Sequence, residues 1–171
     1  MTDVSDSKIV DLKDGLKASL LDTLREKYKK ITLAGGCFDI LHFGHIQFLK
    51  AAKAEGGALV ILLESDEALS RRKKRKPIHT LLQRAHLLAA LSYVDTVIML
   101  PELKTDEEYR QLTEALKPMV IAITDGDPQQ HQKEQQAERV GGTVKVVTKR
   151  VGNLSTSSIT NHAATTGNKS S

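Results

Sequence analysis

Two histidines are the residues of this chain whose types and spacing point most directly to chemistry. His42 and His45 flank Gly44 in the stretch from Gly35 to Leu49, which reads GGCFDILHFGHIQFL. We expect them at the first turn of a helix, where backbone N–H groups lack intrahelical partners and the helix dipole is positive. Glycine lets a phosphate approach the backbone, and two imidazoles can donate hydrogen bonds to its oxygens. The pattern therefore predicts a triphosphate site.

A strand and a helix must position this turn. Residues 31–34 are β-branched and apolar, Gly35-Gly36 breaks the run, and apolar residues recur at helical spacing after Gly44. Further strands are expected at 58–63, 96–99, 119–123 and 143–147, with helices at 77–91, 106–116, 129–140 and 155–163. This alternation predicts an α/β fold, a Rossmann-like open parallel sheet of five strands with helices on both faces. Ligands bind such sheets beyond the carboxyl ends of the strands.

The two ends of the chain are expected to lie outside this arrangement. Residues 9–28 carry leucines at helical spacing and predict one amphipathic helix. We therefore divide the chain into an N-terminal tail and helix (1–30), a single domain (31–163) and a disordered tail (164–171).

Composition limits the class of protein. The chain has 171 residues, 40% of them hydrophobic and 27% charged, as in soluble globular proteins. No apolar run approaches the roughly 20 residues of a membrane-spanning helix, and the polar start does not resemble a secretory signal, so we expect a cytoplasmic protein without a membrane partner. Cys37 is the single cysteine, which excludes an internal disulfide and a multi-cysteine metal site. No metal ligands are assigned.

A basic run, RRKKRK at residues 71–76, accounts for much of the net charge of +4. Such a run is a solvated loop, a nucleic-acid patch or a group of cations that neutralises a triphosphate. Aromatic residues make up only 4% of the chain and tryptophan is missing, which argues against a base-stacking surface. We therefore expect a mobile loop that closes over nucleotide, and no nucleic-acid partner.

Two longer motifs carry a family resemblance. The string GCFDILHFGH, with its HxGH core, resembles the cytidylyltransferase-like nucleotidyltransferases, and RVGNLSTSSI at residues 150–159 is similar to a second motif of that family. Ser155 is a plausible N-cap, and the guanidinium of Arg150 can bind a phosphate bidentately. The strings GCFDILH and LAAL..VD, and the glycine pair before the last strand, look closest to the D-glycero-β-D-manno-heptose 1-phosphate adenylyltransferases.

The resemblance implies a role for each matching residue. The implied catalytic residues are His42, His45 and Lys73; the nucleotide-binding residues are Cys37, Phe38, Gly44, Lys74, Arg150, Ser155, Thr156 and Ser157; the acceptor-binding residues are Asp39, Arg72, Arg84 and Asp127. Alignment without a gap selects Arg72 and Lys74 as phosphate contacts, whereas the heptose branch selects Lys73. Cys37 could act as a nucleophile, but a small loop residue that offers its backbone N–H to phosphate fits better.

The implied reaction transfers a nucleoside monophosphate from an NTP, ATP favoured over CTP, to a phosphorylated small molecule such as a sugar phosphate. Pyrophosphate leaves, and Mg²⁺ accompanies the NTP. Glycerol-3-phosphate cytidylyltransferase and FAD synthetase activities remain alternatives, and a homodimer is left open. A nucleotide-sensing module is the non-enzyme alternative, because Pro128 and the Gly152-Asn153 turn depart from the family pattern.

Overall fold

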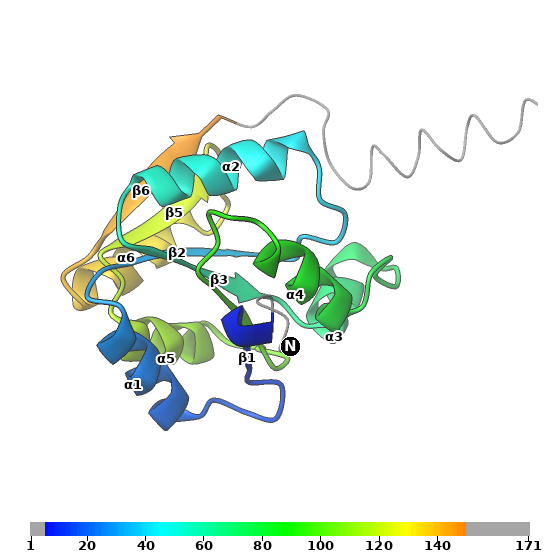
Figure 1. Cartoon of the computed structure of the whole chain (residues 1–171), viewed down its shortest axis with the longest axis horizontal. Coiled ribbons are helices and arrows are strands. Elements are labelled where there is room, and N and C mark those ends of the chain that lie inside the picture. Colours follow the sequence, from blue (N-terminus) through cyan, green and yellow to red (C-terminus); the bar gives the residue numbers. More distant parts are fainter. Residues whose placement is uncertain (1–5, 150–171) are drawn as a thin grey trace, which may run out of the picture.

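The computed structural model of the chain describes residues 6–149, which form a six-stranded, fully parallel sheet (Figure 1). The strand order is β1-β4-β3-β2-β5-β6. The strands are β1 (Ile9–Asp11), β2 (Ile31–Gly36), β3 (Ala58–Leu63), β4 (Thr96–Met99), β5 (Val120–Thr124) and β6 (Thr143–Thr148). The predicted Rossmann-like α/β class is confirmed. The predicted count of five strands is wrong by one, because β1 adds an edge strand beside β4.

The N-terminal region explains the extra strand. A single helix over residues 9–28 was expected, but the chain first forms β1, turns through Gly15 at φ 124°, and only then enters α1 (Ala18–Lys27). Leu12 is fully buried in the loop between them. Its spacing from the leucines of α1 suits a helix as well as this loop, and that coincidence misled the prediction.

Helices cover both faces of the sheet, as predicted. The remaining helices are α2 (Phe43–Ala54), α3 (Asp66–Lys73), α4 (Leu81–Ala89), α5 (Asp106–Leu116) and α6 (Gln130–Arg139), after a short 3₁₀ turn η1 (Asp6–Lys8). One core cluster joins α1, α5 and α6 to one face, and a second joins α2 and α4 to the other. β3, which reads ALVILL, is buried along its whole length because both faces are covered.

The basic run at residues 71–76 is not the simple loop that was expected. Ser65 caps α3 by accepting a hydrogen bond from the Ala68 N–H, and two acidic residues in the first turn suit the positive end of the helix dipole. The helix continues through Lys73 and ends at Lys74, which adopts φ 53°. Half of the run is therefore helical. The next helix begins four residues later than predicted, at Leu81, after a Thr80–Gln83 capping box.

β2 marks the point at which the strand order changes direction. From β2 the chain moves through β3 to β4 on one side, and later through β5 to β6 on the other. In open α/β sheets the crevice at such a point is where ligands bind. The turn that carries the two histidines follows β2 directly. Within residues 6–149, no helix has the length and apolar character needed to cross a membrane.

Candidate active site

The two histidines form a stacked pair at the start of α2. His42 is the N-cap residue, His45 lies in the first turn, and the ring centroids are 3.8 Å apart with an interplanar angle of 22°. The His42 side chain makes no capping hydrogen bond, and its Nδ1 atom is buried without a hydrogen-bond partner among residues 6–149. The first backbone N–H groups of a helix also lack intrahelical partners. Although the His45 and Ile46 N–H groups already donate to the His42 carbonyl oxygen, the imidazoles and the earlier N–H groups of the turn can donate to an anion.

Burial keeps both imidazoles neutral. Burial and the neighbouring charge of His42 lower the pKa of His45 from 6.5 to about 4, although the Ile40 backbone opposes part of this effect. Burial also lowers the pKa of His42. At neutral pH the free protein therefore holds two neutral rings, and each can donate one hydrogen bond. A bound polyphosphate would favour their charged forms.

The pKa values give a prediction for His45. We expect its ring to titrate near pH 4 in the free protein, and a bound triphosphate to raise this pKa by about 1–3 units. Because the folded-state pKa lies below the ordinary value of 6.5, the stabilisation from neutral His45 is complete above pH 6.5 and is lost as the pH falls toward 4. NMR titration of the imidazole protons with and without nucleotide measures both pKa values. Titration at 6.5 in both states would contradict the assignment.

The Phe38 ring packs against His45 in the histidine turn. Phe38 adopts φ 45°, an uncommon conformation for a bulky residue, and its side chain is buried. The ring centroids of Phe38 and His45 are 5.1 Å apart. A Cβ at Gly36 would lie only 3.0 Å from the Phe38 ring, so glycine makes room for it. Strained conformations of this kind concentrate at functional sites. Binding of nucleotide by Phe38 remains a prediction.

Asp39 ties the histidine turn to the segment after the basic run. Its carboxylate is 1% exposed, lies 2.7 Å from the Arg75 guanidinium, and accepts hydrogen bonds from the backbone N–H groups of Ile78 and His79. Burial alone would raise the pKa of Asp39, but these bonds and the charge of Arg75 lower it overall. Asp39 is therefore ionised and held by protein groups, although its Oδ2 atom has no hydrogen-bond partner among residues 6–149. The contacts support a positioning role; its predicted acceptor contact is untested.

Arg84 links three loops through hydrogen bonds. Its side chain has no exposed surface, and it donates hydrogen bonds to the carbonyl oxygens of Cys37, Glu64 and His79 and to the Asp66 carboxylate at 2.7 Å. Arginine is rarely buried so completely unless it is paired. The sequence predicted that Arg84 binds acceptor. Its contacts hold the residues around the site, and its contact with acceptor stays a prediction.

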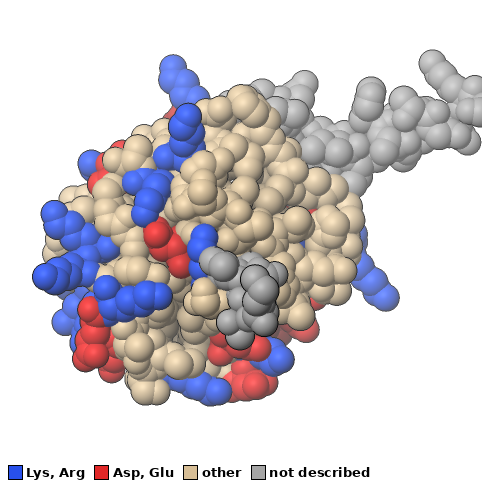
Figure 2. Space-filling model, viewed as in Figure 1, with Lys and Arg blue, Asp and Glu red and all other residues tan. Residues whose placement is uncertain are grey.

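The cations of the basic run fall into two groups. Arg71 pairs with Glu102, Arg72 makes a two-pronged pair with Glu64 at 2.7 and 2.8 Å, and Arg75 pairs with Asp39. Over residues 6–149 no ion pair involves the remaining three cations, which are Lys73, Lys74 and Lys76. Lys73 and Lys74, the two lysines predicted to contact phosphate, are thus among the cations without an ion pair. Figure 2 shows Lys and Arg interspersed with Asp and Glu on one face, and not as a continuous basic band.

Cys37 contributes to the site mainly through its backbone. Its carbonyl accepts a hydrogen bond from Arg84, and its thiol is partly exposed beside Arg72. Since this gives the thiol no covalent role, we predict that Cys37→Ser keeps the turnover rate within about tenfold of wild type. Steady-state assay of pyrophosphate release measures it. Loss of all activity in a folded Cys37→Ser protein would restore the nucleophile hypothesis.

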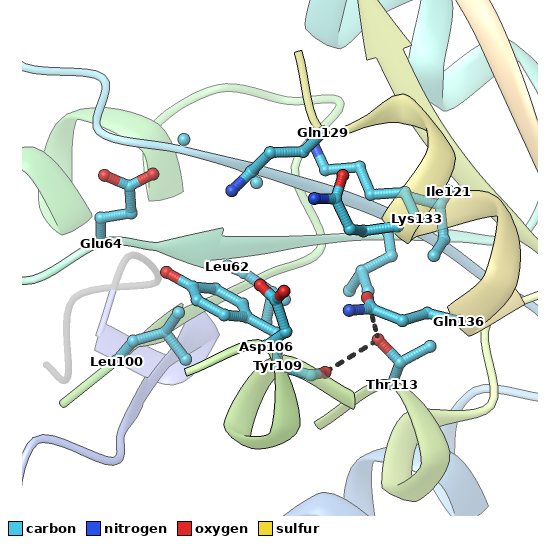
Figure 3. Close-up of a pocket in the computed structure, with 14 residues that line it drawn as sticks. Leu62, Glu64, Leu100, Asp106, Tyr109, Thr113, Ile121, Gln129, Lys133 and Gln136 are labelled. Atoms are coloured by element: carbon cyan, nitrogen blue, oxygen red, sulfur yellow. Dashed lines mark hydrogen bonds between the residues drawn. The ribbon is translucent and has the colours of Figure 1, made fainter. Parts of the chain in front are cut away.

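A pocket lies on the other side of β2 from the histidines, between α5 and α6 (Figure 3). It encloses about 90 Å³, and Gly35 and Gly36 form part of its wall. The two glycines thus separate the pocket from the histidine turn that follows them. The other lining residues are Leu33, Leu62, Glu64, Leu100, Asp106, Tyr109, Thr113, Ile121, Gln129, Gln132, Lys133 and Gln136. Sequence reasoning identified none of these pocket residues as functional.

Asp127 orients one of the pocket residues. Its carboxylate accepts a hydrogen bond from the Lys133 ammonium at 2.7 Å and another from the Gln129 backbone N–H at 2.8 Å. Lys133 is thereby held at the pocket wall. Asp127 was predicted to contact the acceptor directly, and that contact remains a prediction.

The second motif, at residues 150–159, lies outside the residues that the structure describes. Arg150, Ser155, Thr156 and Ser157, together with the expected helix at 155–163, lie beyond residues 6–149. Their predicted contacts with nucleotide stay predictions. Gly44 lies in the first turn of α2, and its predicted contact with phosphate stays a prediction.

Proteins of known sequence are similar to this chain over most of its length. It is 40% identical over 147 residues to the bifunctional protein HldE of Geobacter metallireducens, covering 84% of this chain and 29% of that protein. It is also 46% identical over 101 residues to the FAD synthase of Thermococcus kodakarensis, covering 58% and 66% respectively. The chain therefore spans less than a third of the HldE protein.

Two solved structures share the fold. The lipopolysaccharide core biosynthesis protein from Thermoplasma volcanium superposes with a TM-score of 0.56 at 28% identity, over 71% of this chain and 96% of that one. The pantoate-beta-alanine ligase from Francisella tularensis gives a TM-score of 0.59 at 18% identity, over 90% and 72%, and shows likeness of fold alone. The sequence model of the Cytidylyltransferase-like family matches residues 33–168, from β2 to beyond the described residues. The chain belongs to the cytidylyltransferase-like family.

Proposed function

We propose that this protein is a nucleotidyltransferase that moves a nucleoside monophosphate from an NTP, ATP favoured, to a phosphorylated small molecule such as a sugar phosphate, and releases pyrophosphate. The observation that carries the proposal is the stacked pair of His42 and His45 at the N-terminus of α2, beside a pocket that shares Gly35 and Gly36 with the preceding strand. The histidine turn suits a polyphosphate, and the pocket suits a compact acceptor.

The reaction needs no protein group that forms a covalent bond with the substrate. A phosphate oxygen of the acceptor attacks the α-phosphorus of the NTP in line, the bond to the β-phosphate oxygen breaks, and pyrophosphate leaves. Catalysis of this kind consists of positioning and charge neutralisation. His42 and His45 donate hydrogen bonds to the phosphate oxygens as negative charge develops. Lys73 and Lys74, which have no ion pair among the described residues, neutralise the leaving and attacking phosphates.

Mg²⁺ enters on the NTP in this proposal. Residues 6–149 contain no group of three or more His, Cys, Asp or Glu side chains arranged to hold a metal ion. Mg²⁺ is commonly bound through substrate phosphates and water, with at most one or two carboxylates, and so it does not need such a group. When bound, it would neutralise part of the triphosphate charge.

The similarities leave two acceptor classes open. The motif resemblance to sugar-phosphate adenylyltransferases and the likeness to a lipopolysaccharide core biosynthesis protein favour a sugar phosphate. The similarity to an FAD synthase favours flavin mononucleotide (FMN). A cytoplasmic location is a further part of the proposal, and the question of a homodimer is left open.

The experiment is a screen of the four NTPs with Mg²⁺ against hexose and heptose 1-phosphates, glycerol 3-phosphate and FMN, with pyrophosphate as the readout. We expect acceptor-dependent release with ATP. Nucleotide binding without pyrophosphate release from any pair would instead support the nucleotide-sensing alternative.

A further inference from the structure

We infer that Lys76 is a triphosphate-binding residue of the candidate site, and that Arg75 and Asp39 position it. Because the ligand, the triphosphate of an NTP, comes from the proposed function, this assignment rests on that function. Neither of the two alignments of the family motif with the basic run selects Lys76. The structure singles it out because its backbone is held on both sides while its charge stays free.

Arg75 anchors the chain on the amino side of Lys76. Its guanidinium lies 2.7 Å from the Asp39 carboxylate, which is 1% exposed, and its Nη1 atom donates a hydrogen bond to the Lys76 carbonyl oxygen at 3.0 Å. One planar fork thus joins a buried carboxylate to the backbone of Lys76. If Arg75 moved away to bind phosphate, the buried charge of Asp39 would lose its counter-ion, which is costly. Arg75 therefore acts through Lys76 and is not itself a phosphate ligand.

Asp39 also anchors the chain on the carboxyl side of Lys76. Its Oδ1 atom accepts hydrogen bonds from the backbone N–H groups of Ile78 at 2.8 Å and His79 at 3.3 Å. Between the two anchors, Pro77 fixes its own φ and confines the preceding residue, Lys76, to extended conformations. The backbone of Lys76 is therefore held by contacts before and after it.

The side chain of Lys76 is free by contrast. Lys76 is exposed, and no carboxylate within residues 6–149 pairs with its ammonium. A cation that no protein group neutralises stays available to an anionic ligand, and its flexible four-carbon stem gives it reach. Because the backbone is already ordered, binding an anion costs only the freedom of the side chain.

The same contacts place Lys76 beside the histidine turn. Asp39, to which both anchors lead, precedes His42 by three residues, and His42 begins α2. The ammonium of Lys76 can therefore reach an anion held at the start of α2. The lysine charge and the positive end of the helix dipole then act on the same triphosphate.

The test is isothermal titration with ATP and with CTP, each with Mg²⁺. We expect Lys76→Ala to weaken binding of the preferred nucleotide by about tenfold or more, as for a lost hydrogen bond from a charged group. Lys29→Ala is the matched control, because Lys29 is an exposed lysine before β2, at the opposite end of that strand from the histidine turn. It should change the affinity by less than about twofold, since solvent and salt screen a distant surface charge. Both lysines are exposed, so both variants should fold.

A double-mutant cycle separates positioning from direct contact. Arg75→Ala should weaken nucleotide binding by about fivefold in the wild-type background and by less than about twofold in the Lys76→Ala background, because Arg75 acts only through the lysine it holds. General disruption of the fold would weaken binding in both backgrounds. If Arg75→Ala does not fold, Arg75→Lys takes its place, since an ammonium can pair with Asp39 but lacks the planar fork that also bonds the Lys76 carbonyl oxygen.

Four results would each overturn the assignment of Lys76. They are an affinity of Lys76→Ala no weaker than that of Lys29→Ala, equal effects of Arg75→Ala in both backgrounds, a rise in KM for the acceptor alone, and no nucleotide binding by the wild-type protein. Pyrophosphate release tests the proposed function separately. If nucleotide binding depends on Lys76 and no pyrophosphate forms, Lys76 stays a nucleotide-binding residue while the proposed reaction fails. If Lys76→Ala keeps wild-type affinity and turnover, the proposed reaction stands and the role of Lys76 does not.

Discussion

His45→Ala should lower kcat by about 10²-fold or more while the protein stays folded. The ring of His45 stacks on His42 at the start of α2, in a site where burial holds its pKa at about 4. In such a partly dry site a hydrogen bond to developing phosphate charge is worth more than in water, and alanine cannot supply it. Removing one comparable donor from an enzyme site typically has an effect of this size.

The measurement is steady-state pyrophosphate release by His45→Ala, with circular dichroism to verify folding. His131→Ala provides the control, because His131 lies exposed on α6 with Gln135 as its neighbour. We expect His131→Ala to keep wild-type kcat. Wild-type turnover in His45→Ala would remove this residue from the catalytic group.

Arg84→Ala should destabilise the fold by about 3 kcal/mol. The substitution leaves the carbonyl oxygens of Cys37 and Glu64 and the Asp66 carboxylate without their shared buried donor. Unpaired buried acceptors carry the full cost of lost solvation. Arg84→Lys should recover only part of the stability, because one ammonium cannot reach all four acceptors as a planar guanidinium does.

Urea unfolding monitored by circular dichroism measures the loss. Arg25→Ala is the reference, since Arg25 forms a surface pair with Asp22 and should change stability by less than about 1 kcal/mol. If Arg84→Ala were as stable as Arg25→Ala, Arg84 would not hold the site together, and its predicted contact with acceptor would regain support.

The sheet was largely predictable because its strands are short apolar runs separated by helical patterns. β2, β3, β4, β5 and β6 all lie where the sequence placed them, within one or two residues. β1 was missed because three residues, IVD, carry little periodic signal beside the leucines of α1. α3 was missed because its basic end resembles a solvated loop, although Ser65 followed by Asp66 and Glu67 is a helix-start signal that could have revealed it.

The candidate site was likewise predictable only in part. The histidine turn could be predicted, because its residues are adjacent and their chemistry is specific. The pocket could not, since its walls come from several strands and two helices that meet only in the folded protein, and glutamines normally suggest a solvated surface. One signal existed: Gln129, Gln132, Lys133 and Gln136 follow the i, i+3, i+4, i+7 spacing of a single helix face. The burial of Arg84 has no such signal, because it depends on loops that meet only in the folded protein.

The central claim is transfer of a nucleoside monophosphate to an acceptor phosphate without an enzyme-bound intermediate. The most direct measurement follows ATP labelled with ³²P at the α-phosphate through one turnover with a sugar 1-phosphate and Mg²⁺. We predict that the label appears in the nucleotide-sugar product, in equal amount to the pyrophosphate released, and that none is bound to protein. Label found in free AMP or ADP independently of the acceptor, or held on the protein, would contradict the claim.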